Sequence, residues 1–298
     1  MICSKEFFGG TIPQIEISKK AIESLARESV SRGLTVPGVQ KKLSLNLTSN
    51  DTSSRLTLVG YPSGYILKPQ TVEYPYLPES EDMVMDMAEI VGIKIVPHGL
   101  IKIDEGKEYA YITKRIDRQF KDNSYLMYAM EDFCQLSGRL TSDKYRGSYE
   151  QCAKIISKYS MIPGLDLSEL YLRLVFSFVI GNSDMHLKNF SLIERTPKSR
   201  QFILSPAYDL LNVNIVNPND TEEMALALNG KKSKLNRRDF ISFANSVDVP
   251  VKSAEKLIEK VVSNKERFIE ICNNSYISKE LKEKTIALIN QRIDRIKQ

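Results

Sequence analysis

The sequence contains no tryptophan, two histidines and four cysteines among its 298 residues. Cys3, Cys134, Cys152 and Cys272 lie far apart, and no two of them form a Cys-x-x-Cys pair. Structural zinc sites need clustered cysteine or histidine ligands, so this pattern argues against one. Scattered thiols are typical of a reducing compartment, and we therefore expect a cytoplasmic protein.

Long apolar runs are missing as well. No segment reaches roughly 18 uninterrupted apolar residues, the length that marks a membrane-spanning helix. The first residues show no apolar stretch after basic residues, so we expect no signal peptide and no membrane partner. With 42% hydrophobic and 27% charged residues, the composition is that of a globular protein, and the length allows one large domain or two lobes.

The formal net charge of +5 is unevenly distributed. Residues 231–298 contain 16 Lys and Arg against 9 Asp and Glu, which gives +7 and leaves the remainder slightly acidic. Such a region could contact nucleic acid or an acidic protein. A solvated helical surface explains the same excess, and we favour that interpretation.

The segment Asn182–Ser191 combines Asp, His, Lys and two Asn side chains between the apolar run Leu170–Ile180 and a β-like run that begins at Asn189. Polar groups between buried elements are costly unless they have partners. In phosphoryl-transfer enzymes an Asp accepts the proton of the attacking hydroxyl, and an Asn five residues later holds a metal. The spacing fits Asp184 and Asn189, although a structural turn would use the same residue types.

A second acidic position, Asp209, follows a predicted short strand, Gln201–Leu204. We expect this strand to pair with the one beginning at Asn189, which would bring Asp209 to the end of the hairpin. Mg²⁺ prefers carboxylate and carbonyl oxygens, so Asn189 and Asp209 could hold one ion.

The N-terminal part has the predicted element order of a kinase N-terminal lobe. Alternating apolar residues and helical periodicity predict these elements: a helix over 19–29, a hairpin over 42–59, a strand over 65–69, a helix over 78–91, and a hairpin of 96–103 with 109–114. Lys68 is the cation on the otherwise apolar third strand, where a nucleotide-binding lysine would lie. A strand-end lysine that faces water is the alternative. His98 receives no role.

The rest of the chain is predicted to be mainly helical. The polar segment 115–124 is expected to cross between lobes. Helices are expected over 128–138, 149–159, 166–180, 220–228, 236–246, 251–272 and 277–296.

Seven stretches resemble, in order, the motifs of the HipA-like serine/threonine kinases of bacterial toxin–antitoxin systems. They are Gly38–Leu45, Tyr65–Lys68, Glu81 with Met87-Ala88 and Gly92-Ile93, Lys114–Arg118, Glu131–Gln135, Asn182–Ser191 and Pro206–Asp209. The resemblance covers roughly residues 33–298. It implies an α+β, two-lobed protein-kinase-like fold similar to phosphatidylinositol kinases, with a β-rich N-lobe (1–116) and a larger, mainly helical C-lobe (117–298).

The resemblance also implies roles for individual residues. Asp184 would be the general base, with His186 and Lys188 near the phosphates, and Asn189 and Asp209 would hold Mg²⁺. Lys68, held by Glu81, would contact the phosphates, and backbone groups of 114–116 would meet adenine. The implied ATP-binding residues are Thr35, Pro37, Gly38, Val39, Gln40, Lys41, Lys42, Lys68, Glu81, Lys114, Arg115, Ile116, Asp117, His186, Lys188, Asn189, Tyr208 and Asp209.

The implied activity is that of an ATP- and Mg²⁺-dependent serine/threonine protein kinase, the toxin of a type II toxin–antitoxin module. Family members phosphorylate aminoacyl-tRNA synthetases. The implied partners are a protein substrate, a helix-turn-helix antitoxin similar to HipB that alone would connect the protein to DNA, and a separate small protein in place of the N-terminal subdomain of longer members. A degenerate kinase that acts by binding an antitoxin–DNA complex, and a small-molecule or lipid kinase, are the alternatives.

The sequence departs from the family in its phosphate loop. The family often has Ser-x-Ser-Gly, in which one Ser can be autophosphorylated to silence the enzyme, whereas this chain has Thr35-Val36-Pro37-Gly38. Only Thr35 keeps a hydroxyl, and Pro37 has no amide hydrogen to donate to a phosphate. Autoregulation through Thr35 is therefore a hypothesis.

Overall fold

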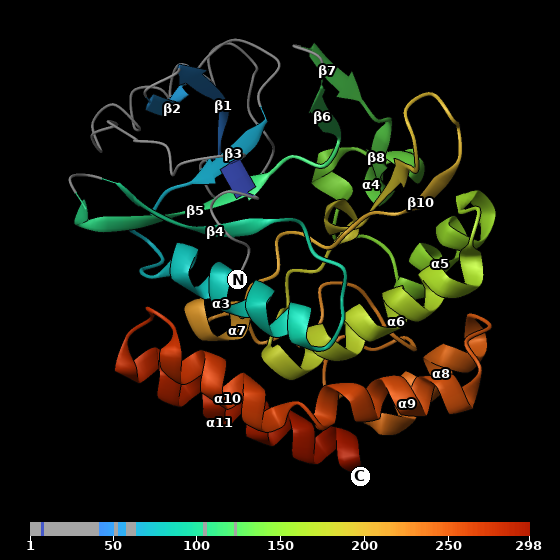
Figure 1. Ribbon diagram of the computed structural model, residues 1–298. Coiled ribbons are helices and arrows are strands. Elements are labelled where there is room, and N and C mark those ends of the chain that lie inside the picture. Colours follow the sequence, from blue (N-terminus) through green and yellow to red (C-terminus); the bar gives the residue numbers. More distant parts are fainter. Residues whose placement is uncertain (1–6, 9–41, 51–52, 58–63, 104–105, 122–123) are drawn as a thin grey trace. The chain divides into compact units, whose positions relative to one another are not determined.

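The structure is a computed structural model, which describes residues 7–8, 42–50, 53–57, 64–103, 106–121 and 124–298 (Figure 1). The chain divides into two compact units, residues 1–82 with 96–127 and residues 83–95 with 128–298. The predicted lobe boundary after Ile116 stays a prediction. The predicted helix over 19–29 lies outside the described residues.

The first unit contains a five-stranded antiparallel sheet of order β2-β1-β3-β5-β4 (Figure 1). Its strands are β1 (Leu43–Asn50), β2 (Ser53–Thr57), β3 (Tyr65–Lys68), β4 (His98–Ile103) and β5 (Glu108–Lys114). The predicted hairpins and the strand that carries Lys68 are confirmed. Alternating apolar residues define the buried face of this sheet. Leu43 and Leu45 are fully buried, and Leu43 pairs with the buried Leu67 on β3.

The polar segment 115–124 was expected to cross between lobes, but it forms part of a hairpin. Strand β6 (Arg118–Lys121) pairs antiparallel with β7 (Ser124–Met127). The rings of Phe120 and Tyr125 lie 5.1 Å apart across this pair. The aromatic pair is not evident in the sequence, because polar residues surround both positions.

The second unit is mainly helical. Its longer helices are α5 (Tyr149–Tyr159), α6 (Pro163–Ile180), α8 (Arg237–Ser246), α9 (Val251–Val262), α10 (Lys265–Asn274) and α11 (Lys279–Lys297). Helix α6 is buried along almost its whole length from Leu170 onward and packs against α5, α9 and α11. An apolar helix of this kind belongs in the interior, as the run Leu170–Ile180 predicted. It begins earlier than predicted, because Pro163 is well suited to a first helical turn.

A three-stranded antiparallel sheet of order β10-β9-β8 completes the second unit, with β8 (Met130–Asp132), β9 (Ser191–Glu194) and β10 (Phe202–Leu204). The strand predicted to begin at Asn189 begins at Ser191 instead, because Leu187–Asn189 forms a 3-10 turn. Its predicted pairing with the strand before Asp209 is confirmed, since Leu192 pairs with Leu204. The helix predicted over 78–91 is confirmed as α3 (Leu77–Ile90), of which residues 77–82 belong to the first unit and 83–90 to the second.

Three helix predictions were wrong, one of them entirely. The helix expected over 128–138 is only α4 (Phe133–Leu136), because Met130–Asp132 pairs with β9 and the Asp132 carboxylate caps α4 by accepting from the N–H of Gln135. Residues 220–228 are not helical, and the short helix α7 (Val213–Val216) precedes them. The long helix expected over 251–272 is divided into α9 and α10.

Among the described residues, no helix combines the length and the apolarity needed to cross a bilayer.

Candidate active site

The candidate catalytic segment, Asn182–Ser191, follows helix α6 after a turn at Gly181. Gly181 adopts a left-handed conformation with φ 78°, and the N–H of Asn182 donates to the carbonyl of Ser177 at 2.8 Å. A Cβ at position 181 would collide with the side chain of Leu288. Only glycine fits both the backbone conformation and the space, so the end of a buried helix fixes the start of the polar segment.

The polar segment folds back on itself around Asp184. The side-chain amide of Asn189 donates to the Asp184 carbonyl at 2.9 Å, and the N–H of His186 donates to the same carbonyl at 2.7 Å. The amide nitrogen of Asn189 is thereby engaged, and the atom that the side chain offers to a ligand is its oxygen. A metal ligand from asparagine uses this oxygen, so Asn189 fits the predicted role.

A tyrosine that sequence reasoning missed contacts the candidate base. The hydroxyl of Tyr145 donates to Oδ1 of Asp184 at 2.6 Å, while Nε2 of His186 lies 4.0 Å from Oδ2. The Asp184 side chain is 43% exposed, so the carboxylate is open to an incoming group.

The electrostatic environment favours proton acceptance at Asp184. Although the side chain is 43% exposed, the surrounding groups remove part of its hydration, and this partial desolvation raises the pKa of Asp184 above its ordinary value. The carboxylates of Asp209 and Asp220 add to the rise, whereas Tyr145 and Lys144 oppose it. A carboxylate with a raised pKa is a better proton acceptor than an ordinary one. Asp184 and Asp209 are thus within electrostatic reach of each other, although their positions in the sequence are far apart.

The hairpin of β9 and β10 leads to Asp209, which has φ 60°. Left-handed conformations are uncommon outside glycine, and Asp tolerates them better than most residues. Upstream, the carbonyl of Ser205 accepts from the guanidinium of Arg173 at 2.8 Å, and the N–H of Ala207 donates to the carbonyl of Lys94. The approach to Asp209 is therefore fixed from two sides.

Tyr208 and Lys188 have partners within the second unit. The hydroxyl of Tyr208 donates to the carbonyl of Lys188 at 3.1 Å and bonds Oγ of Ser191 at 2.5 Å. Burial raises the pKa of Tyr208, so the phenol stays protonated. The ammonium of Lys188 donates to Asp132 at 2.6 Å. No local pattern in the sequence marks Asp132 as the partner of Lys188.

A second polar network fixes the other side of the segment. Oγ of Ser183 donates to Asp220 at 2.7 Å, and the amide of Asn214 donates to the carbonyls of Asp220 and Glu222 at 3.1 and 2.9 Å. These bonds hold residues 217–222, which follow α7, in an irregular path, so the helix expected over 220–228 does not start there.

In the first unit, Lys68 on β3 and Glu81 on α3 form a buried ion pair. Nζ of Lys68 lies 2.5 Å from Oε1 of Glu81, both side chains are 4% exposed, and the ring of Tyr111 lies 5.2 Å from the ammonium. Breaking such a pair would leave a charge in a dry environment. His98 in the same unit contacts Asp82 at 2.9 Å, a structural partnership.

The predicted adenine segment uses two of its amides internally. The N–H of Lys114 donates to Pro97 at 3.0 Å and that of Arg115 to Gly64 at 2.8 Å. Burial favours the neutral form of Asp117, but hydrogen bonds from Arg115 and Arg118 outweigh it and lower the pKa of this carboxyl. Within the predicted segment 114–116, the backbone groups of Ile116 remain the candidates for contacts with adenine.

The predicted phosphate loop lies mostly outside the described residues. This applies to Thr35, Pro37, Gly38, Val39, Gln40 and Lys41; Lys42 is described and immediately precedes β1. In the described ranges, no three His, Cys, Asp or Glu side chains form a metal-binding cluster. Asn189 and Asp209 would be two protein ligands, and Mg²⁺ at nucleotides commonly has one or two, with phosphate oxygens and water completing the shell.

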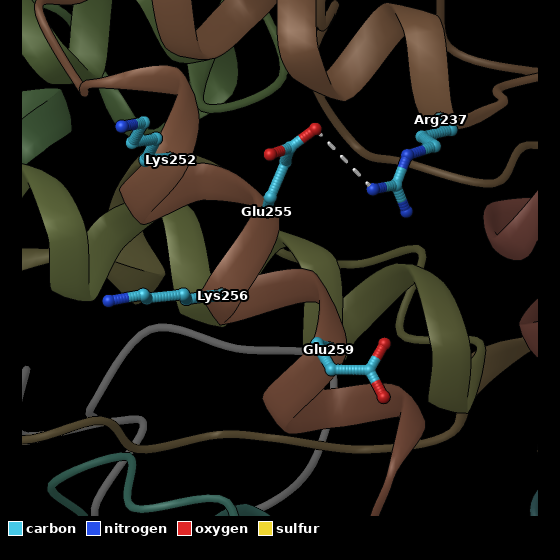
Figure 2. A pocket seen from close by; sticks show the side chains of 5 residues that line it. All are labelled: Arg237, Lys252, Glu255, Lys256 and Glu259. Atoms are coloured by element: carbon cyan, nitrogen blue, oxygen red, sulfur yellow. Dashed lines mark ion pairs between the residues drawn. The ribbon is translucent and has the colours of Figure 1, made fainter.

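A surface hollow lies elsewhere, over α9 and the start of α8 (Figure 2). It is lined by Arg237, Lys252, Glu255, Lys256 and Glu259, and the Arg237 guanidinium lies 3.8 Å from Glu255. Charges of both signs alternate along an exposed helix here. This part of the basic C-terminal region agrees with the solvated helical surface that we favoured.

The fold and the family are established by comparison with known proteins. The structure of HipA with HipB and operator DNA from Shewanella oneidensis superposes with a TM-score of 0.74 over 97% of this chain and 74% of that chain, at 17% identity. The kinase CtkA of Helicobacter pylori gives a TM-score of 0.56 over 85% of this chain and 93% of that chain, at 16% identity. The chain thus has the predicted α+β, kinase-like fold.

The sequence model of the HipA-like C-terminal domain matches residues 34–268. The chain belongs to this family, as the seven motifs predicted. A relative from Haemophilus influenzae named "Putative kinase" is 24% identical over 89% of this chain and 82% of its own length. A relative from Sinorhizobium fredii, "Putative kinase Y4dM", is 30% identical over 75% of this chain, which spans 55% of that protein.

Proposed function

We propose that this protein is an ATP- and Mg²⁺-dependent serine/threonine protein kinase. One observation carries the proposal: the side-chain amide of Asn189 donates to the Asp184 carbonyl, so the candidate base and a candidate metal ligand share one local structure. Base, metal-ligand asparagine and metal-ligand aspartate are the parts that phosphoryl transfer requires. Relatives named as kinases support the assignment.

In the proposed reaction, an acceptor hydroxyl attacks the γ-phosphorus of ATP. A new O–P bond forms, the bond from the γ-phosphorus to the β–γ bridging oxygen breaks, ADP leaves, and the hydroxyl proton moves to Asp184. Asn189 and Asp209 would hold Mg²⁺, which when bound neutralises charge on the phosphates. Lys68, oriented by Glu81, contacts the phosphates in this proposal.

The remaining predicted contacts belong to the same proposal. His186 and Lys188 lie in the catalytic segment and would balance charge that develops during transfer. The loop 35–42, the segment 114–117 and Tyr208 would complete the ATP site.

The biological role that we propose is that of a toxin in a type II toxin–antitoxin module in the cytoplasm. A structural neighbour is described as a HipA toxin in complex with HipB and operator DNA, which supports a helix-turn-helix antitoxin as partner, with DNA reached only through it. The proposed substrate is a translation component such as an aminoacyl-tRNA synthetase. A small protein in place of the N-terminal subdomain is a further proposed partner.

Purified protein incubated with γ-labelled ATP, Mg²⁺ and an extract of host proteins tests this function. We expect label on serine or threonine of a protein, and none with Asp184→Asn. Label confined to lipid or small molecules would favour the second alternative. No label, together with antitoxin binding that Asp184→Asn leaves unchanged, would favour the binding-protein alternative.

A further inference from the structure

We infer that Tyr145 is a positioning residue, whose hydroxyl holds one oxygen of Asp184 so that the other oxygen faces the acceptor hydroxyl. The inference rests on the proposed function and deepens it. The observation is the 2.6 Å hydrogen bond from the Tyr145 hydroxyl to Oδ1 of Asp184, between residues that lie 39 positions apart in the chain.

An aspartate needs such a partner to act as a directed base. Rotation of a carboxylate about its last side-chain bond meets only a broad, weak preference, so backbone placement alone does not fix its oxygens. With Oδ1 of Asp184 bonded to Tyr145, Oδ2 is the oxygen presented to an acceptor. Nε2 of His186 lies 4.0 Å from Oδ2, beyond hydrogen-bond distance.

Contacts with neighbouring residues also position Tyr145, the donor of this hydrogen bond. The carbonyl of Lys144 accepts from the N–H of Leu187 at 3.1 Å, so the backbone beside Tyr145 is bonded to the catalytic segment itself. The Tyr145 ring packs edge-on against His186 with centroids 5.1 Å apart, and the Lys144 ammonium lies 4.9 Å from the ring centroid. Locked partners of this kind hold a catalytic group within the small tolerance that transfer needs.

The hydroxyl, more than the ring, explains a tyrosine at this position. Tyr145 is 44% exposed as a residue, so packing contributes less here than at a buried tyrosine. Partial desolvation and then the bond to Asp184 raise the pKa of the phenol, so it keeps the proton that it donates. A phenylalanine would make the same ring contacts without this bond.

Tyr159 provides a matched control. It is 41% exposed, and the ammonium of the preceding Lys158 lies 4.7 Å from its ring centroid, as in Lys144–Tyr145. It lies at the end of α5 and is not one of the residues placed at the site.

The test compares kcat and KM of the wild type, Tyr145→Phe, Tyr145→Ala and Tyr159→Phe in full-length protein, with Mg-ATP and the protein acceptor identified in the extract. We expect Tyr145→Phe to lower kcat about 10- to 100-fold, the scale of a misplaced catalytic group. The KM for ATP should stay within about twofold, because the hydroxyl contacts the base and not the nucleotide. Tyr159→Phe should match the wild type. Circular dichroism checks that each variant is folded.

A second measurement separates positioning from packing. In an Asp184→Ala background, Tyr145→Phe should cause no further loss, because the two groups act as a unit. A wild-type kcat for Tyr145→Phe, or an equal loss with and without Asp184, would overturn the inference while the proposed function stands. If Tyr145→Phe were unfolded, the kcat of folded Tyr145→Ala would decide in its place. A wild type that transfers no phosphate to any acceptor would overturn both.

Discussion

The side-chain amide of Asn189 donates a hydrogen bond of 2.9 Å to the backbone carbonyl of Asp184. The candidate base and one candidate metal ligand therefore share one local structure, which starts at the end of α6. Their spacing of five residues has a physical reason, because it lets the second side chain reach back to the first backbone carbonyl.

Asp184→Ala and Asp209→Ala should each reduce transfer to a small residual rate while the fold survives. Rates should fall by orders of magnitude, because base and metal ligands act together. Asp184→Ala should still bind ATP, whereas Asp209→Ala should weaken Mg-ATP binding, as measured by calorimetry. Asp248→Ala is the matched control, since Asp248 is exposed and also has a positive φ of 59°. Normal transfer by Asp209→Ala would refute its assignment.

Lys68→Met should destabilise the first unit by about 3–5 kcal/mol. It removes the ammonium whose nitrogen lies 2.5 Å from Oε1 of Glu81, and this leaves a buried carboxylate without that cation. The double variant Lys68→Met/Glu81→Leu should recover part of this loss, since it removes the second charge. Lys102→Met is the control: Lys102 is an exposed sheet lysine whose ammonium lies 6.0 Å from the ring centroid of Tyr109. Urea unfolding followed by circular dichroism measures the differences, because the chain has no tryptophan. Equal stability of Lys68→Met and Lys102→Met would contradict the prediction.

Gly181→Ala should destabilise the protein by about 1–2 kcal/mol from the left-handed backbone alone, and by more from the collision with Leu288. Transfer should fall with it, because the turn orients the catalytic segment. Gly164→Ala is the paired control in the same helix. A Cβ there meets no atom within 4 Å, so this variant should be neutral or stabilising by up to about 1 kcal/mol. Thermal melts distinguish the two, and similar melting temperatures would rule the argument out.

Stability should depend on pH through Asp117. Its pKa is lowered in the folded protein from an ordinary value near 3.8, so its stabilising effect is present above that value and disappears as the pH falls through the folded pKa. Asp117→Asn should cost about 1–3 kcal/mol at neutral pH, since it weakens charged hydrogen bonds to Arg115 and Arg118. The difference from the wild type should shrink below about pH 4. Melting temperatures between pH 3 and 7 test this, and a gap that does not change would speak against it.

Elements that depend on a local pattern of apolar residues were predicted correctly from the sequence. Alternating leucines from Leu43 onward predicted the first hairpin, the run Leu170–Ile180 predicted the interior of α6, and the strands flanking the turn before Asp209 paired as expected. Each of these follows from the burial of one face or of a whole element, which periodicity records directly.

Contacts between distant positions were not predictable in the same way. The Tyr145–Asp184 bond joins residues 39 positions apart, and the Lys188–Asp132 pair joins residues 56 positions apart. No periodicity marks such partners, and Tyr145 alone is indistinguishable from any surface tyrosine. The helix expected over 220–228 failed for a related reason. Asn214 bonds the carbonyls of Asp220 and Glu222, and the hydroxyl of Ser183, 37 positions away, donates to the Asp220 carboxylate.

Arg173, buried within α6, connects three parts of the second unit. Its guanidinium donates to the Ser205 carbonyl and to Glu169, and Glu169 also accepts from the N–H of Lys94. The backbone that precedes Asp209 is therefore bonded to a buried side chain of α6, and a ligand could shift this backbone only by breaking that bond. For inhibitor design, this means that a compound directed at Asp209 must match the backbone path already present, because shifting the chain at Ser205 would break its bond to a buried guanidinium.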